Sequence, residues 1–115
     1  MAGVILVEDS PYESALAYLA LSRTTPSVLQ APDLRSAARI ASRAQLAILG
    51  PRAMSRISDR QVQALGIPAV GIAVRLSSAD RRRAIAAGVR AVYERPRSWK
   101  AYLALLEKIH HAVKA

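Results

Sequence analysis

Short apolar runs alternate five times with segments of helical periodicity, and this order constrains the fold more than any other feature of the chain. The predicted strands span residues 4–7, 27–30, 46–49, 69–74 and 91–93. Most of them are continuous apolar runs, which is typical of parallel strands that are buried on both faces. The alternation therefore predicts a single α/β domain over residues 1–115, with a doubly wound parallel sheet between two layers of helices.

Capping residues delimit the helices that are expected between these strands. The first helix is predicted over residues 11–21, with Ser10 as its N-cap and Pro11 at its first position. Pro32 and Asp33 mark the start of the second helix. Ser58 and Gly66 mark the start and the end of the third helix, and Ser78 and Gly88 mark those of the fourth. Ser98 marks the start of the last helix.

The spacing of apolar residues predicts which face of each helix packs on the sheet. On the first helix this inner face comprises Tyr12, Ala15, Leu16, Leu19 and Ala20. On the helix that follows residue 78, Ala84, Ile85 and Ala87 are expected to face inward. On the last helix the inward residues are Trp99, Tyr102, Leu103, Leu106, Ile109 and Val113, so Trp99 and Tyr102 are interpreted as packing residues and not as base-stacking platforms.

Composition narrows the classes of function. The formal net charge is +9, from 17 basic and 8 acidic residues, which favours an acidic protein face, a nucleic acid or an anionic membrane as partner. An evenly solvated surface is the alternative interpretation of this charge.

The chain has no cysteine, which excludes disulfides and thiolate catalysis. With no apolar run of membrane-spanning length and no signal-peptide pattern, we expect a cytoplasmic protein without a membrane partner.

An acidic pair, Glu8 and Asp9, follows the first strand directly. In open α/β sheets ligands bind at the carboxyl ends of the strands, so this pair lies where chemistry would take place. A residual magnesium site is one interpretation, but two carboxylates without a third ligand hold magnesium weakly. We favour a structural pair with Arg95 as its counter-ion, and we predict no metal and no cofactor.

Other clusters of reactive side chains have simpler explanations. His110 and His111 are adjacent, so on a helix they diverge and cannot chelate one metal ion. Ser77, Ser78 and Asp80 suggest a catalytic triad by residue type only, and a helix cap explains them better.

Several short segments carry a family resemblance when they are taken in order. They are ILVEDSP at 5–11, the strand from Gln45 to Gly50, IPAVGIAV at 67–74, AIAAG at 84–88 and ERP at 94–96. Together they resemble the receiver domains of two-component response regulators over essentially the whole chain. The resemblance implies a flavodoxin-like (CheY-like) five-stranded sheet in the order 2-1-3-4-5, and a cis peptide bond between Arg95 and Pro96.

The resemblance also implies which groups an active site would need. An active receiver binds magnesium through two carboxylates after the first strand and phosphorylates an aspartate that ends the third. A hydroxyl after the fourth strand and a lysine after the fifth contact the phosphoryl oxygens. At these positions the chain has Glu8 with Asp9, Gly50, Ala73 and Arg95, and Val92 stands where a switching aromatic usually lies.

Most of these residues cannot perform the implied chemistry. Gly50 has no side chain to phosphorylate, Ala73 has no hydroxyl, and Arg95 lacks the compact ammonium of lysine. No acidic residue lies between Asp33 and Asp59, so a shifted register does not supply an acceptor. We therefore predict a degenerate phosphorylation site with no catalytic residue, in a pseudo-receiver that is not an enzyme.

A basic segment after the fourth strand is the candidate partner-binding surface. It comprises Arg75, Arg81, Arg82, Arg83, Arg90, Arg97 and Lys100. In receivers the corresponding helix 4, strand 5 and helix 5 form the usual site of dimerisation or docking, as the resemblance implies. We predict a phosphorylation-independent signalling module that binds an acidic protein, such as a kinase or an output protein, or that forms a homodimer.

Two other functions compete with this prediction. Binding of nucleic acid or another polyanion by the same basic segment is the main alternative, although the interleaved aromatics and glycine loops of common nucleic-acid binders are absent. A magnesium enzyme that uses Glu8 and Asp9 is the second alternative, and no other feature of the sequence supports it.

Overall fold

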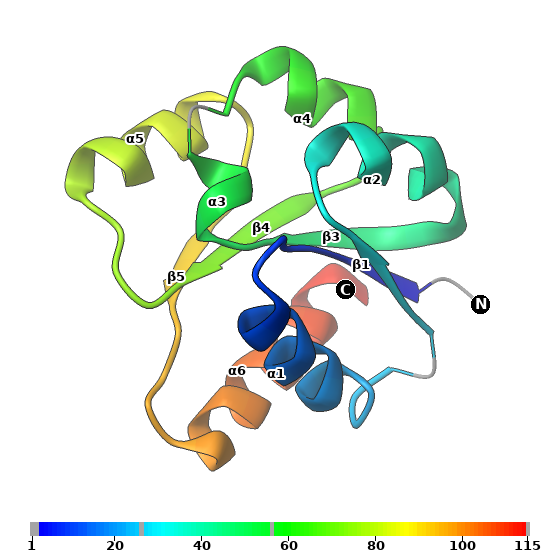
Figure 1. The fold of residues 1–115 in the computed structure, drawn as a ribbon, viewed down its shortest axis with the longest axis vertical. Helices are drawn as coiled ribbons and strands as arrows, with labels where there is room; N and C mark the ends of the chain where they lie inside the picture. Colours follow the sequence, from blue (N-terminus) through cyan, green and yellow to red (C-terminus); the bar gives the residue numbers. More distant parts are fainter. Residues whose placement is uncertain (1–2, 26, 56, 115) are drawn as a thin grey trace.

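The computed structural model describes residues 3–25, 27–55 and 57–114, with side chains described as far as residue 111. A five-stranded parallel sheet forms the centre of the molecule (Figure 1). Its strands are β1 (Gly3–Val7), β2 (Val28–Ala31), β3 (Ala44–Leu49), β4 (Ala69–Ala73) and β5 (Val92–Glu94). The order β2-β1-β3-β4-β5 confirms the predicted flavodoxin-like topology, and every strand lies within two residues of its predicted position.

Helices cover both faces of this sheet, which confirms the three-layer prediction (Figure 1). One face carries α1 (Pro11–Leu21) and α6 (Trp99–Lys114), and the other carries α2 (Leu34–Ile40), α3 (Pro51–Met54), α4 (Asp59–Leu65) and α5 (Ser78–Ala86). A 3-10 turn, η1 (Ala41–Arg43), connects α2 to β3. Within the described ranges, none of these helices has the length and apolar character needed to cross a membrane.

The alternating side chains of the strands divide the core into two clusters. Ile5 and Val7 of β1 point to the side of α2, α4 and α5, whereas Val4 and Leu6 point to the side of α1 and α6. All residues of β1 and β4 are buried, because these strands are covered on both faces.

Most predicted helix caps are confirmed. Ser58 and Gln61 form a capping box at the start of α4, and the Ser98 side chain accepts a hydrogen bond in the first turn of α6. Gly66 ends α4 with a φ of +67°, and Gly88 follows α5 with a φ of +112°. Glycine adopts these left-handed conformations without the steric cost that a Cβ would add.

Two predicted caps are wrong in detail. Ser77, not Ser78, caps α5, because the Ser77 Oγ accepts a hydrogen bond from the Asp80 N–H at 3.1 Å and Ser78 already lies in the helix. Ser10 holds the N-cap position of α1, but its side chain makes no capping hydrogen bond. The one-turn helix α3 was not predicted, because four residues are too few to show a helical period.

The predicted inner face of α1 is partly wrong. Ala20 is buried and Leu16 is partly buried against the core, as predicted. Ala15 is exposed, Tyr12 and Leu19 are 69% and 59% exposed, and Ala17 and Leu21 are buried in their place. Ala17 and Ala20 let the helix lie close to the sheet, whereas Tyr12, Tyr18 and Leu19 point outward. The sequence of α1 is apolar almost all round, so its periodicity could not identify the buried face.

The other inner faces are confirmed except at two positions. Tyr102, Leu106 and Ile109 are buried on α6, and Ala84 and Ala87 are buried at α5. Trp99, at the start of α6, is 40% exposed, and Ile85 on α5 is 46% exposed. The side chain of Val113 lies outside the described residues.

The prediction of a cis peptide bond before Pro96 is wrong, because that bond is trans. The expectation rested on the resemblance alone, and the intrinsic preference for trans before proline, about 0.5–1 kcal/mol, prevails here. The register at β5 is nevertheless regular, since Ala73 pairs with Glu94 and the Arg95 N–H donates to the Ala73 carbonyl oxygen at 2.9 Å.

Candidate functional site

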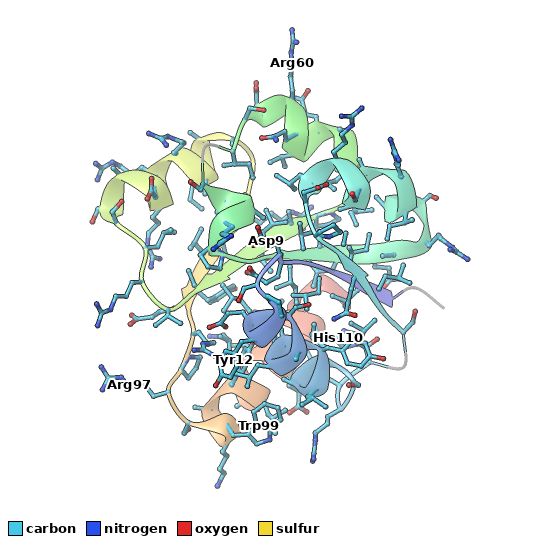
Figure 2. All side chains as sticks on the ribbon, in the orientation of Figure 1. Asp9, Tyr12, Arg60, Arg97, Trp99 and His110 are labelled. Atoms are coloured by element: carbon cyan, nitrogen blue, oxygen red, sulfur yellow. The ribbon has the colours of Figure 1, made fainter. Side chains whose placement is uncertain are left out.

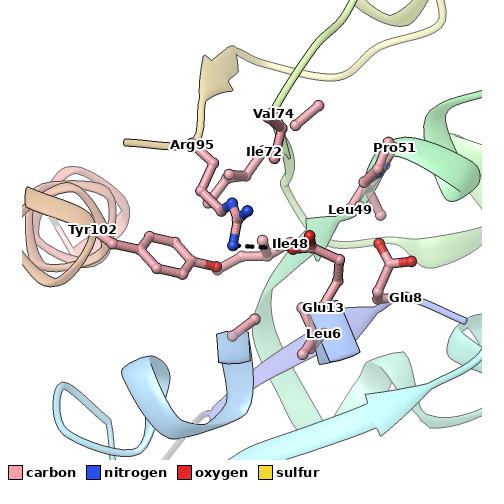
Figure 3. Close-up of a pocket in the computed structure, with 13 residues that line it drawn as sticks. Leu6, Glu8, Glu13, Ile48, Leu49, Pro51, Ile72, Val74, Arg95 and Tyr102 are labelled. Carbon is pink, nitrogen blue, oxygen red and sulfur yellow. Dashed lines mark ion pairs between the residues drawn. The ribbon is translucent and has the colours of Figure 1, made fainter. Parts of the chain in front are cut away.

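The carboxyl ends of β1, β3, β4 and β5 bring the predicted site residues to one edge of the sheet. Glu8 follows β1, and Gly50 follows β3 with its N–H donating to the Val7 carbonyl oxygen at 2.9 Å. Ala73 ends β4 and Arg95 follows β5. Glu8, Gly50, Ala73 and Arg95 line one small cavity at this edge (Figure 3).

The Glu8 side chain lies against Gly50. A Cβ atom added at residue 50 would fall on the Glu8 Oε2 atom and lie 2.6 Å from the Glu8 Cδ. Gly50 has a φ of −77°, which any residue adopts, so the backbone does not require glycine here. A side chain at residue 50 would need the end of the Glu8 side chain to move aside. The Glu8 carboxylate thus occupies the space into which a side chain from residue 50 would extend.

Burial determines the titration of Glu8, which is only 6% exposed. Desolvation raises the pKa of the Glu8 carboxyl above its usual value, and the nearby carboxylates of Asp9 and Glu13 raise it further. The Ser10 N–H donates to Glu8 Oε1 at 3.1 Å, and this hydrogen bond acts in the opposite direction.

The ion pairs at this edge differ from the predicted ones. Arg95 was expected to be the counter-ion of Glu8 and Asp9, but its Nη1 lies 3.3 Å from Glu13 Oε2 (Figure 3). Asp9 instead pairs with Arg52, with 3.2 Å between Asp9 Oδ2 and Arg52 Nη1. Asp9 and Glu13, the two carboxylates near Glu8, therefore pair with different arginines.

Sequence reasoning missed both new participants. Glu13 is the single charged residue of α1, and it lies on the partly buried side of that helix. Its position at the inner face would have indicated a buried partner if the face had been assigned correctly. Arg52 lies in α3, which the sequence pattern did not reveal.

These residues do not fit a magnesium site of the kind the fold suggests. Glu8 is turned onto Gly50 and bound by the Ser10 N–H, whereas Asp9 is engaged by Arg52. Across residues 3–25, 27–55 and 57–114, no three histidine, cysteine, aspartate or glutamate side chains are grouped closely enough to hold a metal ion. We therefore derive no metal-dependent step at this edge.

The cavity itself has a volume of about 30 Å³. This volume accommodates one or two water molecules, since one water needs about 10–15 Å³. Tyr102 reaches the cavity from α6, and burial raises the pKa of its phenol to about 12, so the hydroxyl stays protonated at neutral pH. Glu8 accepts the hydrogen bond from the Ser10 N–H and Arg95 Nη1 pairs with Glu13, whereas the buried Arg95 Nε has no hydrogen-bond partner within the described residues.

The residues of the predicted basic surface have different roles. Arg81 Nη1 donates to the Val92 carbonyl oxygen at 2.8 Å and so links α5 to β5. Arg83 lies 3.7 Å from Asp80 in a solvent-exposed pair. Arg82 is exposed on the same helix, and Arg97 projects from the segment before α6 (Figure 2).

Exposed arginines also occur far from this segment. Arg35 and Arg39 lie on α2, Arg43 on η1 and Arg60 on α4. In Figure 2 Arg60 and Arg97 point away from the molecule at distant places on its surface. The excess of positive charge is therefore spread over several elements.

With this fold and geometry established, comparison with solved structures identifies the class of fold. The chain matches the phosphorylated cyanobacterial phytochrome response regulator RcpA with a TM-score of 0.75 and 19% identity, over 99% of this chain and 94% of that one. It matches the receiver domain of a signal transduction histidine kinase from Syntrophus aciditrophicus (TM-score 0.71, 20% identity, 99% and 93% coverage) and FixJ-N (TM-score 0.72, 18% identity, 99% and 94% coverage).

The chain therefore has the fold of a response-regulator receiver domain. At these identities the likeness concerns the fold alone. The chain matches none of the protein-family models and none of the curated proteins with which it was compared.

Proposed function

We propose that residues 1–115 form a single cytoplasmic, receiver-like signalling domain that acts without phosphorylation or catalysis, by binding a protein partner. The observation that carries this proposal is the contact between Glu8 and Gly50. In an active receiver the residue at position 50 would be the phosphorylated aspartate, and here the Glu8 carboxylate fills the space in front of it.

The neighbouring residues support the same conclusion. Ala73 offers no hydroxyl to a phosphoryl group, and Arg95 is engaged by Glu13. Stabilising the charge that develops during phosphoryl transfer needs a metal ion or free cationic groups at the reacting oxygens. The pairing of Arg95 Nη1 with Glu13 and of Asp9 with Arg52 supports the proposal that this edge does not supply them.

The test is exposure to small phosphoryl donors. Acetyl phosphate or beryllofluoride with magnesium is expected to leave the mass and the amide spectrum of the protein unchanged, while an active receiver treated in parallel is modified. Gly50→Asp alone is expected to remain inefficiently labelled, because the new side chain meets Glu8 and Ala73 still lacks a hydroxyl. Rapid labelling of the wild type at any carboxylate would overturn the proposal.

We infer that the partner presents acidic groups to α5, β5 and the start of α6. The exposed basic residues offered there are Arg75, Arg82, Arg90, Arg97 and Lys100, together with Arg83, whose ion pair with Asp80 is solvent-exposed. Arg81 has a structural bond to β5, so we assign it a supporting role. A signalling kinase or an output protein with an acidic face fits this surface.

Polyanion binding is the second candidate, and one observation favours it. The exposed arginines of α2, η1 and α4 extend the positive charge well beyond the predicted surface. A nucleic acid that contacted several of these residues would show an affinity that falls steeply with salt concentration. Binding of DNA or RNA with such a slope, and no acidic protein partner, would place this candidate first.

A further inference from the structure

Large apolar side chains are exposed on α1 more than on any other described helix. Tyr12 is 69% exposed, Leu19 is 59% exposed and Tyr18 is 40% exposed. In Figure 2 Tyr12 lies at the first turn of this helix. The remaining exposed large apolar residues lie elsewhere: Val74 follows β4, Ile85 lies on α5 and Trp99 lies on α6.

The outward face of α1 also lacks charge. It comprises Tyr12, Ala15, Tyr18 and Leu19, and Glu13, the one charged residue of the helix, pairs with Arg95 in the partly buried layer. By contrast, α2 exposes Arg35 and Arg39, and α5 exposes Arg82. A solvated helix in a protein of net charge +9 would ordinarily carry charged residues on its outer face.

We propose that this face of α1 binds a second copy of the chain in an antiparallel, two-fold symmetric pair. Two molecules that each carry a charge of +9 repel one another wherever basic surfaces meet, and the outer face of α1 avoids that repulsion. The proposal concerns a surface separate from α5, β5 and the start of α6.

The spacing along α1 makes the face complementary to itself. Tyr12 and Leu19 are two helical turns apart on one side of the helix, and Ala15 lies between them. When two copies pack antiparallel about an axis between Ala15 and Leu16, Tyr12 of each copy meets Leu19 of the other. The small alanine at the crossing point lets the two helices approach closely.

The expected dimer is weak. The helix α1 has 11 residues and is therefore about 16 Å long. One such face buries less than the roughly 1,200–2,000 Å² of an ordinary stable interface. We therefore expect a dissociation constant in the micromolar range, with dimers populated at high protein concentration.

The test is sedimentation of the whole chain over a range of concentrations, at low and at high sodium chloride. Salt screens the repulsion between the two basic molecules, so dimerisation is expected to strengthen several-fold at high salt. Binding of an acidic partner or a nucleic acid would weaken under the same conditions, so the sign of the salt effect separates this proposal from the proposed function.

Single substitutions locate the interface. Leu19→Glu and Tyr12→Glu are each expected to leave the protein monomeric, with an unchanged circular dichroism spectrum because both side chains are exposed. Ile85→Glu on α5, which also places a charge at an exposed apolar site, is the matched control and is expected to dimerise like the wild type.

Three results would overturn the proposal. They are a wild type that stays monomeric at several hundred micromolar, a dimer that tolerates both α1 substitutions, and a dimer that Ile85→Glu alone dissociates. If one α1 variant fails to fold, the other still decides between the remaining outcomes. None of these results bears on phosphorylation, which the donor experiment tests independently.

Discussion

At the scale of single residues, the protonation of the Glu8 carboxyl affects the stability of the protein. Its carboxyl is buried beside Gly50, and burial raises its pKa above the usual value of 4.5. The folded state therefore binds this proton more tightly than the unfolded state does. Consequently the free energy of unfolding decreases as the pH rises from 4.5 to the pKa of Glu8 in the folded state. Above that folded-state pKa, the full cost of burying the ionised carboxylate lowers the stability of the protein.

Glu8→Gln is expected to stabilise the protein at neutral pH. The amide removes the buried charge, while its carbonyl oxygen still accepts the hydrogen bond from the Ser10 N–H. We expect the Tm at pH 7 to rise by about a few degrees and the difference from wild type to vanish near pH 4. Thermal melts between pH 4 and pH 8 measure this, with the exposed Glu107→Gln as control. A lower Tm at pH 7 would show that the charge on Glu8 is stabilising.

At the scale of elements, α5 is attached to the sheet by one long side chain as well as by its buried alanines. Ala84 packs into the core, and Arg81 reaches the Val92 carbonyl oxygen of β5. The basic residues of this helix are therefore not equivalent, although they are adjacent in the sequence.

Arg81→Ala is expected to lower the free energy of unfolding by about 1–2 kcal/mol, since it removes a hydrogen bond from a charged donor to a partly buried carbonyl. Arg82→Ala, on the same helix and exposed, should change stability by less than about 0.5 kcal/mol. Urea denaturation of both variants measures the difference. Equal effects would mean that the link between α5 and β5 contributes nothing to stability.

At the scale of the whole molecule, positive charge covers several elements, while α1 presents an uncharged face. Long-range attraction of an acidic partner then depends on total charge, whereas the orientation of the complex depends on the arginines that it contacts. Substitutions at two distant places can separate these contributions.

The double variant Arg82→Glu with Arg83→Glu is expected to slow association with an acidic partner and to flatten its salt dependence. Both side chains are exposed, so thermal melts should be close to those of the wild type. Arg39→Glu on α2 is the control and should have a smaller effect on the association rate. A control that weakens binding as much as the double variant would mean that the partner docks elsewhere.

The order of the strands and of every helix except α3, the parallel sheet and most helix ends could be predicted from the sequence. These features depend on local patterns: apolar runs, Ser58 and Ser98 at helix starts, and Gly66 and Gly88 at helix ends. The meeting of Glu8, Gly50, Ala73 and Arg95 at one edge could also be predicted, because the carboxyl ends of parallel strands lie together.

Only the tertiary structure decided what these residues contact. The apolar sequence of α1 fits either face, and packing against the sheet selected Ala17 and Leu21 in place of Tyr12 and Leu19. The pairing of Arg95 with Glu13 and the position of Glu8 against Gly50 join segments far apart in the chain. Such contacts depend on three-dimensional distances of a few ångströms, and no local periodicity in the sequence records them.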